Sequence, residues 1–358
     1  MLNKQVDYKL FFSVFTLIIF GMIMISSVSV YSSFRVTSLF EKAGLINEAY
    51  NHFYVIRNIT HVVISMILLL FLVKVPYSFF EKYAKHILGW NLVLMLYVLF
   101  FWQTLNGATW WINIPGLPSL QPVEFLKFSL IIFLAYYFKK YKEKVSSFTD
   151  GFVPFFGLLF SIVIILWLQP DFGSVMIIWP IMVMMFFIAG AKVKHLAYFI
   201  WMGMLLFTFV YNVWEYDKKT GKNINSLWYI TQRIDNFIAD EKEQIKNKTI
   251  NYQTEQAIIA IGSWGFSGLG FWNSIQKFWY LPEVQWDFVF SVIIEELGFI
   301  WWLVLLSFYL FIWYRGYLIS FYSQDLFAKY ASFWITTWIL VQACVNIWVN
   351  LNIVPLTG

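Results

Sequence analysis

Residues 151–168 read GFVPFFGLLFSIVIILWL, a run with no charged side chain and close to the length of one membrane crossing. A helix needs about 20 mostly apolar residues to span a bilayer. Similar runs recur along the whole chain of 358 residues, of which 60% are hydrophobic and only 13% charged. Soluble domains carry roughly 25% charged residues, so this composition excludes a soluble enzyme and also intrinsic disorder. Because the apolar runs are continuous rather than alternating, a transmembrane β-barrel is excluded too.

The apolar runs predict an all-α polytopic membrane protein with one transmembrane domain over residues 1–358 and nine spans. With the N-terminus in the cytoplasm, the lysine-rich short loops also lie inside, as the positive-inside rule expects. This orientation leaves residues 215–287, between the seventh and eighth spans, as a large extracytoplasmic loop. The nine runs lie at 10–31, 54–75, 87–103, 121–138, 151–168, 173–190, 195–214, 288–313 and 330–350.

Neither a metal site nor a resident cofactor is predicted. The four histidines show no metal-ligand spacing, and the single cysteine, Cys344, lies in an apolar run where packing is its expected role. Glycine-rich phosphate loops and Ser-His-Asp arrangements are not found either. A divalent cation stays open as an alternative. The net charge of +5 is explained by its placement in the short loops, so no nucleic-acid partner is expected.

Two acidic residues lie at the predicted outer ends of spans, where a carboxylate is informative because it is costly beside hydrocarbon. Glu124 belongs to the segment QPVEFLK and has Lys127 three residues further on, which is one helical face. The alternative role for this pair is a structural ion pair between helices. Asp171 follows Gln169-Pro170 at the junction of two spans, and its alternative role is a helix cap.

Asp287 is the third outer carboxylate and the candidate general base. Its neighbours Trp286 and Phe288 would partly desolvate the carboxylate and make it a stronger base, although helix capping is again the alternative. Glu295 and Glu296 follow about 12–13 Å further along the same helix, too far for a catalytic pair with Asp287. Because span counting assigns all three outer carboxylates to one side of the membrane, we expect them to share an outward-facing cavity. Such a cavity suits a substrate with a polar head and an apolar tail.

These same residues resemble the SEDS family of bacterial cell-wall polymerases, the FtsW, RodA and SpoVE group. The resemblance leans toward FtsW because of the Asn-Ser-x-Gln-Lys-Phe segment that begins at Asn273. Family members usually have His-Thr before the key aspartate, whereas this chain has Gln285-Trp286. The matching motifs lie at 106–112, 121–127, 169–173, 252–263, 273–283 and 287–300.

The resemblance implies a SEDS-type helical bundle and a peptidoglycan glycosyltransferase of the bacterial cytoplasmic membrane. Its substrate would be lipid II, a disaccharide-pentapeptide on undecaprenyl diphosphate, polymerised on the outer side during division or elongation. The implied partners are a class B penicillin-binding protein, which cross-links the strands, and membrane lipid. The resemblance assigns the essential acid to Asp287. The implied substrate-binding residues are Glu124, Lys127, Arg233, Lys277 and Glu283. Asp171 is added to them because span counting assigns it to the same outer side of the membrane.

Two further functions stay open at this point. A flippase for the lipid-linked precursor would also need charged groups in a membrane cavity, although it should place some of them along the inner half. A non-catalytic scaffold that recruits a transpeptidase is the other alternative. The chain reaches Gly358 where family members continue into a tenth span, so we expect nine spans here and not ten.

Overall fold

The structure is a computed structural model that describes residues 6–101, 112, 120–169, 171–220, 251–262, 265–279, 281 and 284–354. Within those ranges every regular element is a helix, apart from one isolated bridge between Ile112 and Leu120. The all-α prediction is confirmed. The first elements are α1 (Tyr8–Val28), α2 (Val30–Lys42), α3 (Phe53–Leu72), α4 (Tyr77–Phe101), α5 (Pro122–Lys140), η1 (Lys142–Lys144) and η2 (Phe148–Phe152). The others are α6 (Val153–Leu168), α7 (Phe172–Ile188), α8 (Val193–Thr220), α11 (Asn251–Gly262), α12 (Gln276–Trp279), α13 (Val289–Tyr322) and α14 (Leu326–Asn350).

Each of the nine predicted apolar runs falls in a helix, namely α1, α3 to α8, α13 and α14. In the part of the chain that the structure describes, six helical stretches are long and apolar enough to cross a bilayer. A multi-pass membrane protein is therefore confirmed, and the total of nine crossings stays a prediction. The six stretches are Tyr8–Val28, Phe53–Leu72, Tyr77–Phe100, Phe148–Leu168, Val289–Tyr322 and Leu326–Asn350.

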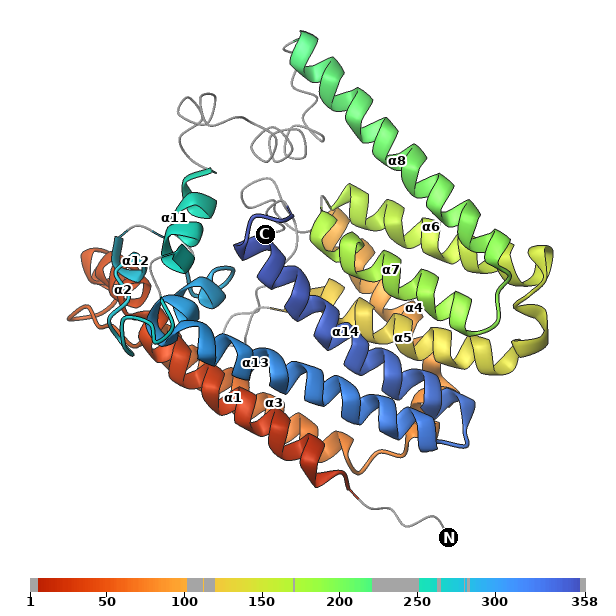
Figure 1. Cartoon of the computed structure of the whole chain (residues 1–358), viewed down its shortest axis with the longest axis horizontal. Helices are drawn as coiled ribbons and strands as arrows, with labels where there is room; N and C mark the ends of the chain where they lie inside the picture. The colour runs from red at the N-terminus through yellow and green to blue at the C-terminus, as the bar shows by residue number, and fades with distance from the viewer. Residues whose placement is uncertain are drawn as a thin grey trace.

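The helices form one bundle in which α13 and α14 lie side by side near the middle (Figure 1). On one side α14 packs against α5 and α7, and on the other α13 packs against α1. α13 and α14 approach each other so closely that a Cβ atom on Gly316 of α13 would collide with the side chain of Thr336 of α14. This close approach fixes the register of the two helices that carry most of the candidate site.

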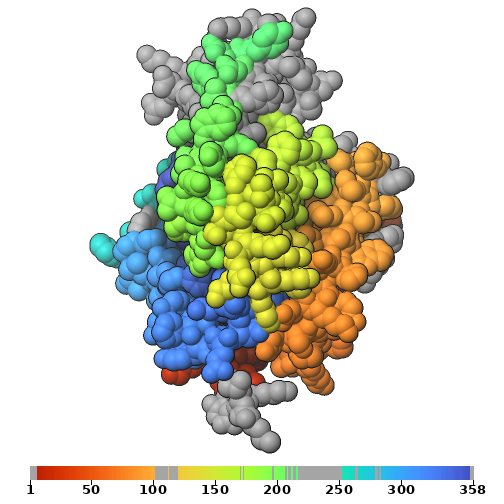
Figure 2. All heavy atoms as spheres, turned by 90° about the vertical axis from the view of Figure 1, so that its right-hand side faces the viewer, coloured from red at the N-terminus to blue at the C-terminus, as the bar shows by residue number. Residues whose placement is uncertain are grey.

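The outer helices of the bundle expose large apolar surfaces. α3 contacts α1 and α2 yet has no buried residue, as expected for a helix with hydrocarbon around most of its circumference. α8 packs against α7 and extends beyond the ends of α6 and α7 (Figures 1 and 2). It continues to Thr220, beyond the predicted end of the seventh span, so the first residues of the predicted long loop are helical.

The first predicted outer loop contains α2, which apolarity alone did not predict. α2 turns polar side chains inward: the buried Thr37 hydroxyl donates to the carbonyl of Tyr50 at 2.7 Å and accepts the N–H of Tyr50 at 2.9 Å. Ser33, also buried, accepts the N–H of Tyr54 at 3.2 Å. A helix whose buried face is made of hydroxyl groups has too little apolar character for a search for spans to find it.

Candidate active site at the Asp287 end of the bundle

The Asp287 turn lies between residue 284 and the start of α13, over a small hydrophobic cluster. Val284 and Phe288 are both buried in that cluster together with Val28 at the end of α1. Phe288 is the N-cap residue of α13, so Asp287 lies one position before the cap, and its side chain is half-buried. The packing of its neighbours fixes the backbone of the aspartate while leaving the residue partly accessible.

Asn350, the last residue of α14, ties this turn to a second helix. Its amide nitrogen donates to the backbone carbonyl of Asp287 at 2.8 Å and to the carbonyl of Asn346 at 2.9 Å. Its carbonyl oxygen accepts the Ser291 hydroxyl at 2.6 Å and the Ser291 N–H at 3.3 Å. The Asn350 side chain is completely buried, and a buried amide with all these partners holds a fixed orientation. The end of α14 therefore sets the position of Asp287.

The two residues before Asp287 hold the opposite side of the turn. The Ser32 hydroxyl of α2 donates to the buried Gln285 side-chain oxygen at 2.8 Å. The Trp286 indole meets the ring of Tyr54 edge-on, with centroids 5.9 Å apart, a favoured arrangement of aromatic rings. Gln285 and Trp286 are the positions where this chain departs from the His-Thr pattern of the family. Here both side chains attach the turn to α2 and α3.

Glu124 and Lys127 form the predicted ion pair at the start of α5. The Lys127 ammonium donates to Glu124 at 2.7 Å and to the Gln342 side-chain oxygen at 3.2 Å. The Trp338 indole N–H donates to the same Gln342 oxygen at 2.7 Å. Lys127 is 4% exposed and Glu124 38%, so the pair offers a carboxylate to the cavity while its ammonium stays within the bundle. The ion pair is confirmed, and a substrate contact stays a prediction.

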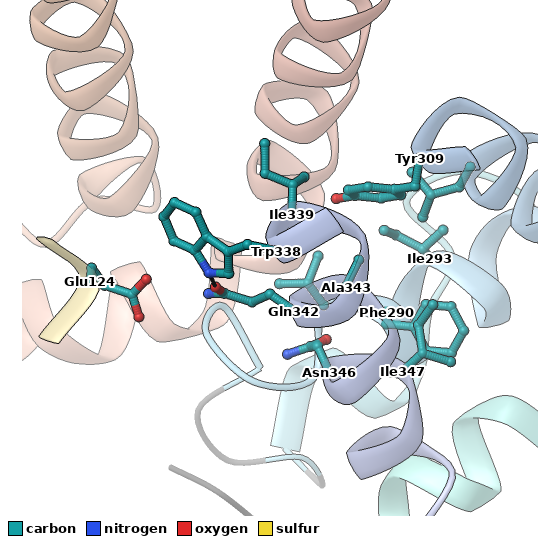
Figure 3. Close-up of a pocket in the computed structure, with 12 residues that line it drawn as sticks. Glu124, Phe290, Ile293, Tyr309, Trp338, Ile339, Gln342, Ala343, Asn346 and Ile347 are labelled. Carbon is teal, nitrogen blue, oxygen red and sulfur yellow. Dashed lines mark hydrogen bonds between the residues drawn. The ribbon is translucent and has the colours of Figure 1, made fainter. Parts of the chain in front are cut away.

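A cavity of about 510 Å³ lies beside this pair. Figure 3 shows Glu124 directed toward Trp338 and Gln342 of α14. Val289, two residues after Asp287, lines this cavity, but Asp287 itself is not among the lining residues, so Glu124 is the one predicted outer carboxylate in its wall. The wall is also polar at Gln342 and Asn346. A cavity with a few polar groups on a mostly apolar wall suits an amphiphilic ligand. Its other lining residues are Phe290, Ile293, Leu305, Tyr309, Ile339, Ala343 and Ile347.

Asp171 caps α7, as the sequence allowed. Its carboxylate accepts the N–H of Ser174 at 3.0 Å and the Ser174 hydroxyl at 2.8 Å. Burial raises the pKa of Asp171 above its ordinary value, although the Ser174 hydrogen bonds and the positive charge of Lys127 oppose that rise. Asp171 is thus an electrostatic neighbour of the ion pair, and it is not among the residues that line the 510 Å³ cavity. The capping role is confirmed, and substrate binding by Asp171 stays a prediction.

Lys277 is buried, which its position in the predicted extracytoplasmic loop did not indicate. Its ammonium pairs with Glu296 at 2.7 Å, with neither side chain exposed, and also donates to the Ser27 hydroxyl at 2.9 Å. It does not line the 510 Å³ cavity. The remaining predicted residues, Arg233 and Glu283, lie outside the residues that the structure describes. Substrate binding by these three residues stays a prediction.

Sequence reasoning missed Asn350, Gln342 and Trp338. The signal was present, because Gln342, Asn346 and Asn350 follow one another at a spacing of four within an apolar run. That spacing puts them on one helical face, and polar residues inside a span usually face the protein interior. For metals, no group of three or more His, Cys, Asp or Glu residues able to hold an ion is found in the described part of the chain.

This fold and site define a multi-pass α-helical membrane protein with charged and amide side chains around a cavity at one end of its bundle. The family model for the FtsW/RodA/SpoVE family, described as cell cycle protein, matches residues 8–358. The chain belongs to this family. Stage V sporulation protein E of Bacillus subtilis is 31% identical over 364 residues, covering 100% of this chain and 91% of that protein. A probable peptidoglycan glycosyltransferase FtsW of Wigglesworthia glossinidia brevipalpis is 30% identical over 356 residues, covering 98% and 86%.

Solved structures share the fold. A chain from a structure described as the structural coordination of polymerization and crosslinking by a peptidoglycan synthase complex superimposes with a TM-score of 0.70. It is 20% identical, and the match covers 99% of this chain and 90% of that chain. The rod shape determining protein RodA of Thermus thermophilus gives a TM-score of 0.57 at 20% identity, covering 98% and 86%. The predicted SEDS-type bundle is thus confirmed.

Proposed function

We propose that this protein is a peptidoglycan glycosyltransferase that polymerises lipid II on the outer side of the cytoplasmic membrane, with Asp287 as general base. The observation that carries the proposal is a mostly apolar cavity lined by Glu124, the partner of Lys127, and by Val289, two residues after Asp287. Relatives named probable peptidoglycan glycosyltransferase FtsW match 98% of the chain at 30–31% identity, which supports the same activity.

The reaction needs a base because a sugar hydroxyl is a weak nucleophile at neutral pH. The Asp287 carboxylate takes the proton of the acceptor hydroxyl while that oxygen bonds to the anomeric carbon of the donor sugar. The bond from that carbon to the diphosphate breaks, and its electron pair leaves with the diphosphate. A positioned base contributes about 10²- to 10⁴-fold to such a step. Direct displacement inverts the anomeric carbon, so one base suffices and no second carboxylate near Asp287 is required.

The leaving diphosphate needs positive charge nearby, and Lys127 is the cation we assign to it. Its ammonium lies beside the cavity and is held by Glu124 and Gln342, so it is pre-organised and partly screened from water. Lys277 is less suited to this role because its ammonium is enclosed by Glu296, Ser27 and the Trp272 carbonyl. Arg233 stays a second candidate by resemblance.

The outer location follows from the charge pattern of the short loops, which we extend to the N-terminus in the cytoplasm. A class B penicillin-binding protein is the proposed partner, since the newly made strands must be cross-linked. The solved peptidoglycan synthase complex, one chain of which shares this fold, supports such an assembly.

The test compares wild-type protein with Asp287→Asn in vesicles that contain labelled lipid II, with glycan length read on a gel. Asp150→Ala is the matched control, because Asp150 is an exposed carboxylate in η2, outside the site. We expect polymer from wild type and from Asp150→Ala, and a loss of about 10²-fold or more with Asp287→Asn. Equal yields from all three proteins would refute the assignment of the base. Transfer of lipid II between leaflets without polymer would favour the flippase, and neither activity would favour the scaffold.

A further inference from the structure

Two polar clusters join α1 to α13 at opposite ends. At one end Arg315 of α13 donates to Asp7, the N-cap residue of α1, at 2.6 Å. At the other end the Ser27 hydroxyl of α1 donates to Glu296 of α13 at 2.7 Å, and Lys277 completes that cluster. At 1.5 Å per residue, α1 rises about 30 Å from Asp7 to Ser27.

That separation equals the hydrocarbon thickness of a bilayer, about 30 Å. Between the clusters α1 is a strongly apolar helix, and α13 carries no charged side chain from Leu297 to Tyr314. Charged groups are costly in hydrocarbon and usual at its edges. The spacing of the two clusters therefore matches the two edges of the hydrocarbon layer, with the Lys277–Glu296 pair, whose side chains are both buried in the protein, on the Asp287 side.

Residues 265–278 lie at this edge and turn an apolar surface outward. Phe266 is 78% exposed, Ile275 60% and Trp272 46%. The one charged residue of the segment, Lys277, is buried. A segment facing water would normally expose polar side chains, so an outward surface without charge and rich in large apolar groups indicates contact with something apolar. The other exposed apolar residues of the segment are Leu269, Phe271 and Phe278.

Part of the backbone of the segment is hydrogen-bonded within the protein, as a membrane environment favours. α13 is broken at Gly298 (φ 79°, ψ −175°). Near this break the carbonyls of Glu295 and Glu296 accept the N–H groups of Leu269 and Gly270, both at 2.9 Å.

The side chains of the two glutamates bind the rest of the segment. The Glu295 carboxylate accepts the N–H of Ile275 at 3.0 Å and the Ser274 hydroxyl at 2.5 Å. Lys277 donates to the Trp272 carbonyl at 2.7 Å, which turns that polar group inward while the indole stays exposed. Ser274 and Lys277 thus bind α13, whereas the large apolar side chains are exposed together with the uncharged Ser267 and Asn273.

We propose that residues 265–278 are a membrane-interfacial segment whose exposed aromatic and aliphatic side chains lie in the outer part of the lipid leaflet on the Asp287 side. Lipid is the occupant because the surface lies at the edge of the hydrocarbon layer, one bilayer thickness from Asp7 and Arg315. Trp and Phe at that depth match the aromatic belts of membrane proteins. This inference concerns the membrane contact and does not depend on the proposed catalytic activity.

The test places a fluorescent bimane label on single cysteines and measures quenching by brominated lipids. The native thiol is removed by Cys344→Ala, and Phe266→Cys and Ile275→Cys are labelled separately in the full-length protein in phosphatidylcholine vesicles. Val63→Cys, at the exposed middle of α3, is the deep control, and Glu48→Cys, exposed between α2 and α3, is the aqueous control. If the label disturbs the structure at one of the two positions, the other position still reports where the segment lies.

We expect the labels at positions 266 and 275 to lose emission with lipids brominated near the headgroup, and to lose less with lipids brominated near the chain end. The deep control should show the reverse order, and the aqueous control should be quenched by iodide but not by either lipid. Labels at both sites that behave like the aqueous control would overturn the proposal. The apolar surface of residues 265–278 would then lie in water, where it could contact another protein and not lipid.

Discussion

Replacing Lys277 with methionine tests whether the buried ion pair holds the segment against α13. The ammonium donates to Glu296, Ser27 and the Trp272 carbonyl at 2.7–2.9 Å, and neither charged side chain is exposed. Methionine keeps an apolar stem of similar length but removes the charge and its three hydrogen bonds, which leaves the Glu296 carboxylate buried without a counter-charge. Breaking a buried ion pair from one side costs about 3–5 kcal/mol. We expect Lys277→Met to lower the free energy of unfolding by about that amount.

Lys139→Met is the matched control. Lys139 also pairs with two acids, Glu81 at 2.7 Å and Asp325 at 2.6 Å, but its side chain is 31% exposed. Pairs open to solvent contribute about 0–1 kcal/mol each, so the control should lose about 2 kcal/mol at most.

The assay is loss of helical circular dichroism during a denaturant titration, with all variants in the same micelles. The double variant Lys277→Met/Glu296→Gln removes both buried charges and should recover part of the loss, because no buried carboxylate is left unpaired. The reasoning is refuted if Lys277→Met costs no more than Lys139→Met, or if the double variant is no more stable than the single one.

Three further predictions concern the rest of the bundle. Asn350→Ala frees the Asp287 carbonyl, so the turnover number should fall by about 10²-fold with little change in KM; an unchanged turnover number would show that the turn is held by other contacts. Gly316→Ala pushes a methyl group into Thr336 and should cost about 1–3 kcal/mol in a denaturant titration, with recovery when Thr336→Ala is added; no loss would contradict the close approach. Burial raises the pKa of Asp325, but hydrogen bonds from Lys139 and the backbone outweigh that effect and hold the pKa below its ordinary value. Its stabilising effect should be complete above the pKa of the unfolded chain and lost as the pH falls through the lowered pKa, and Asp325→Asn should abolish this part of the acid-side loss in a thermal melt series.

The bundle was predictable because one property, continuous apolarity over the length of a membrane crossing, identifies a membrane helix. Each apolar run in the sequence became a helix, since every backbone group in hydrocarbon must be bonded within its own segment. The boundaries were less predictable. α13 continues to Tyr322 and α8 to Thr220, well beyond the apolar runs, because a helix does not end where its side chains become polar. α2 was missed because its buried face is polar.

The site was predictable in part, for the same physical reason. Glu124, Asp171 and Asp287 stood out because carboxylates at the ends of apolar spans are rare and expensive. What each carboxylate does depends on partners distant in the sequence, such as Gln342 for the Lys127 pair and Asn350 for Asp287. A spacing of three residues could predict an ion pair within α5, but no local pattern indicates which residue of α14 lies beside it.

The end of α14 also limits where the proposed base can act. α13 breaks at Gly298, so its first part, which follows Asp287, does not continue the direction of the part that packs along α14. Asn350, the last residue of α14, bonds both the Asp287 carbonyl and the Ser291 hydroxyl, so the Asp287 turn lies at the level of that helix end. A diphosphate held by Lys127 must therefore place its sugar at the level of the end of α14 if Asp287 is to take the proton of the acceptor hydroxyl.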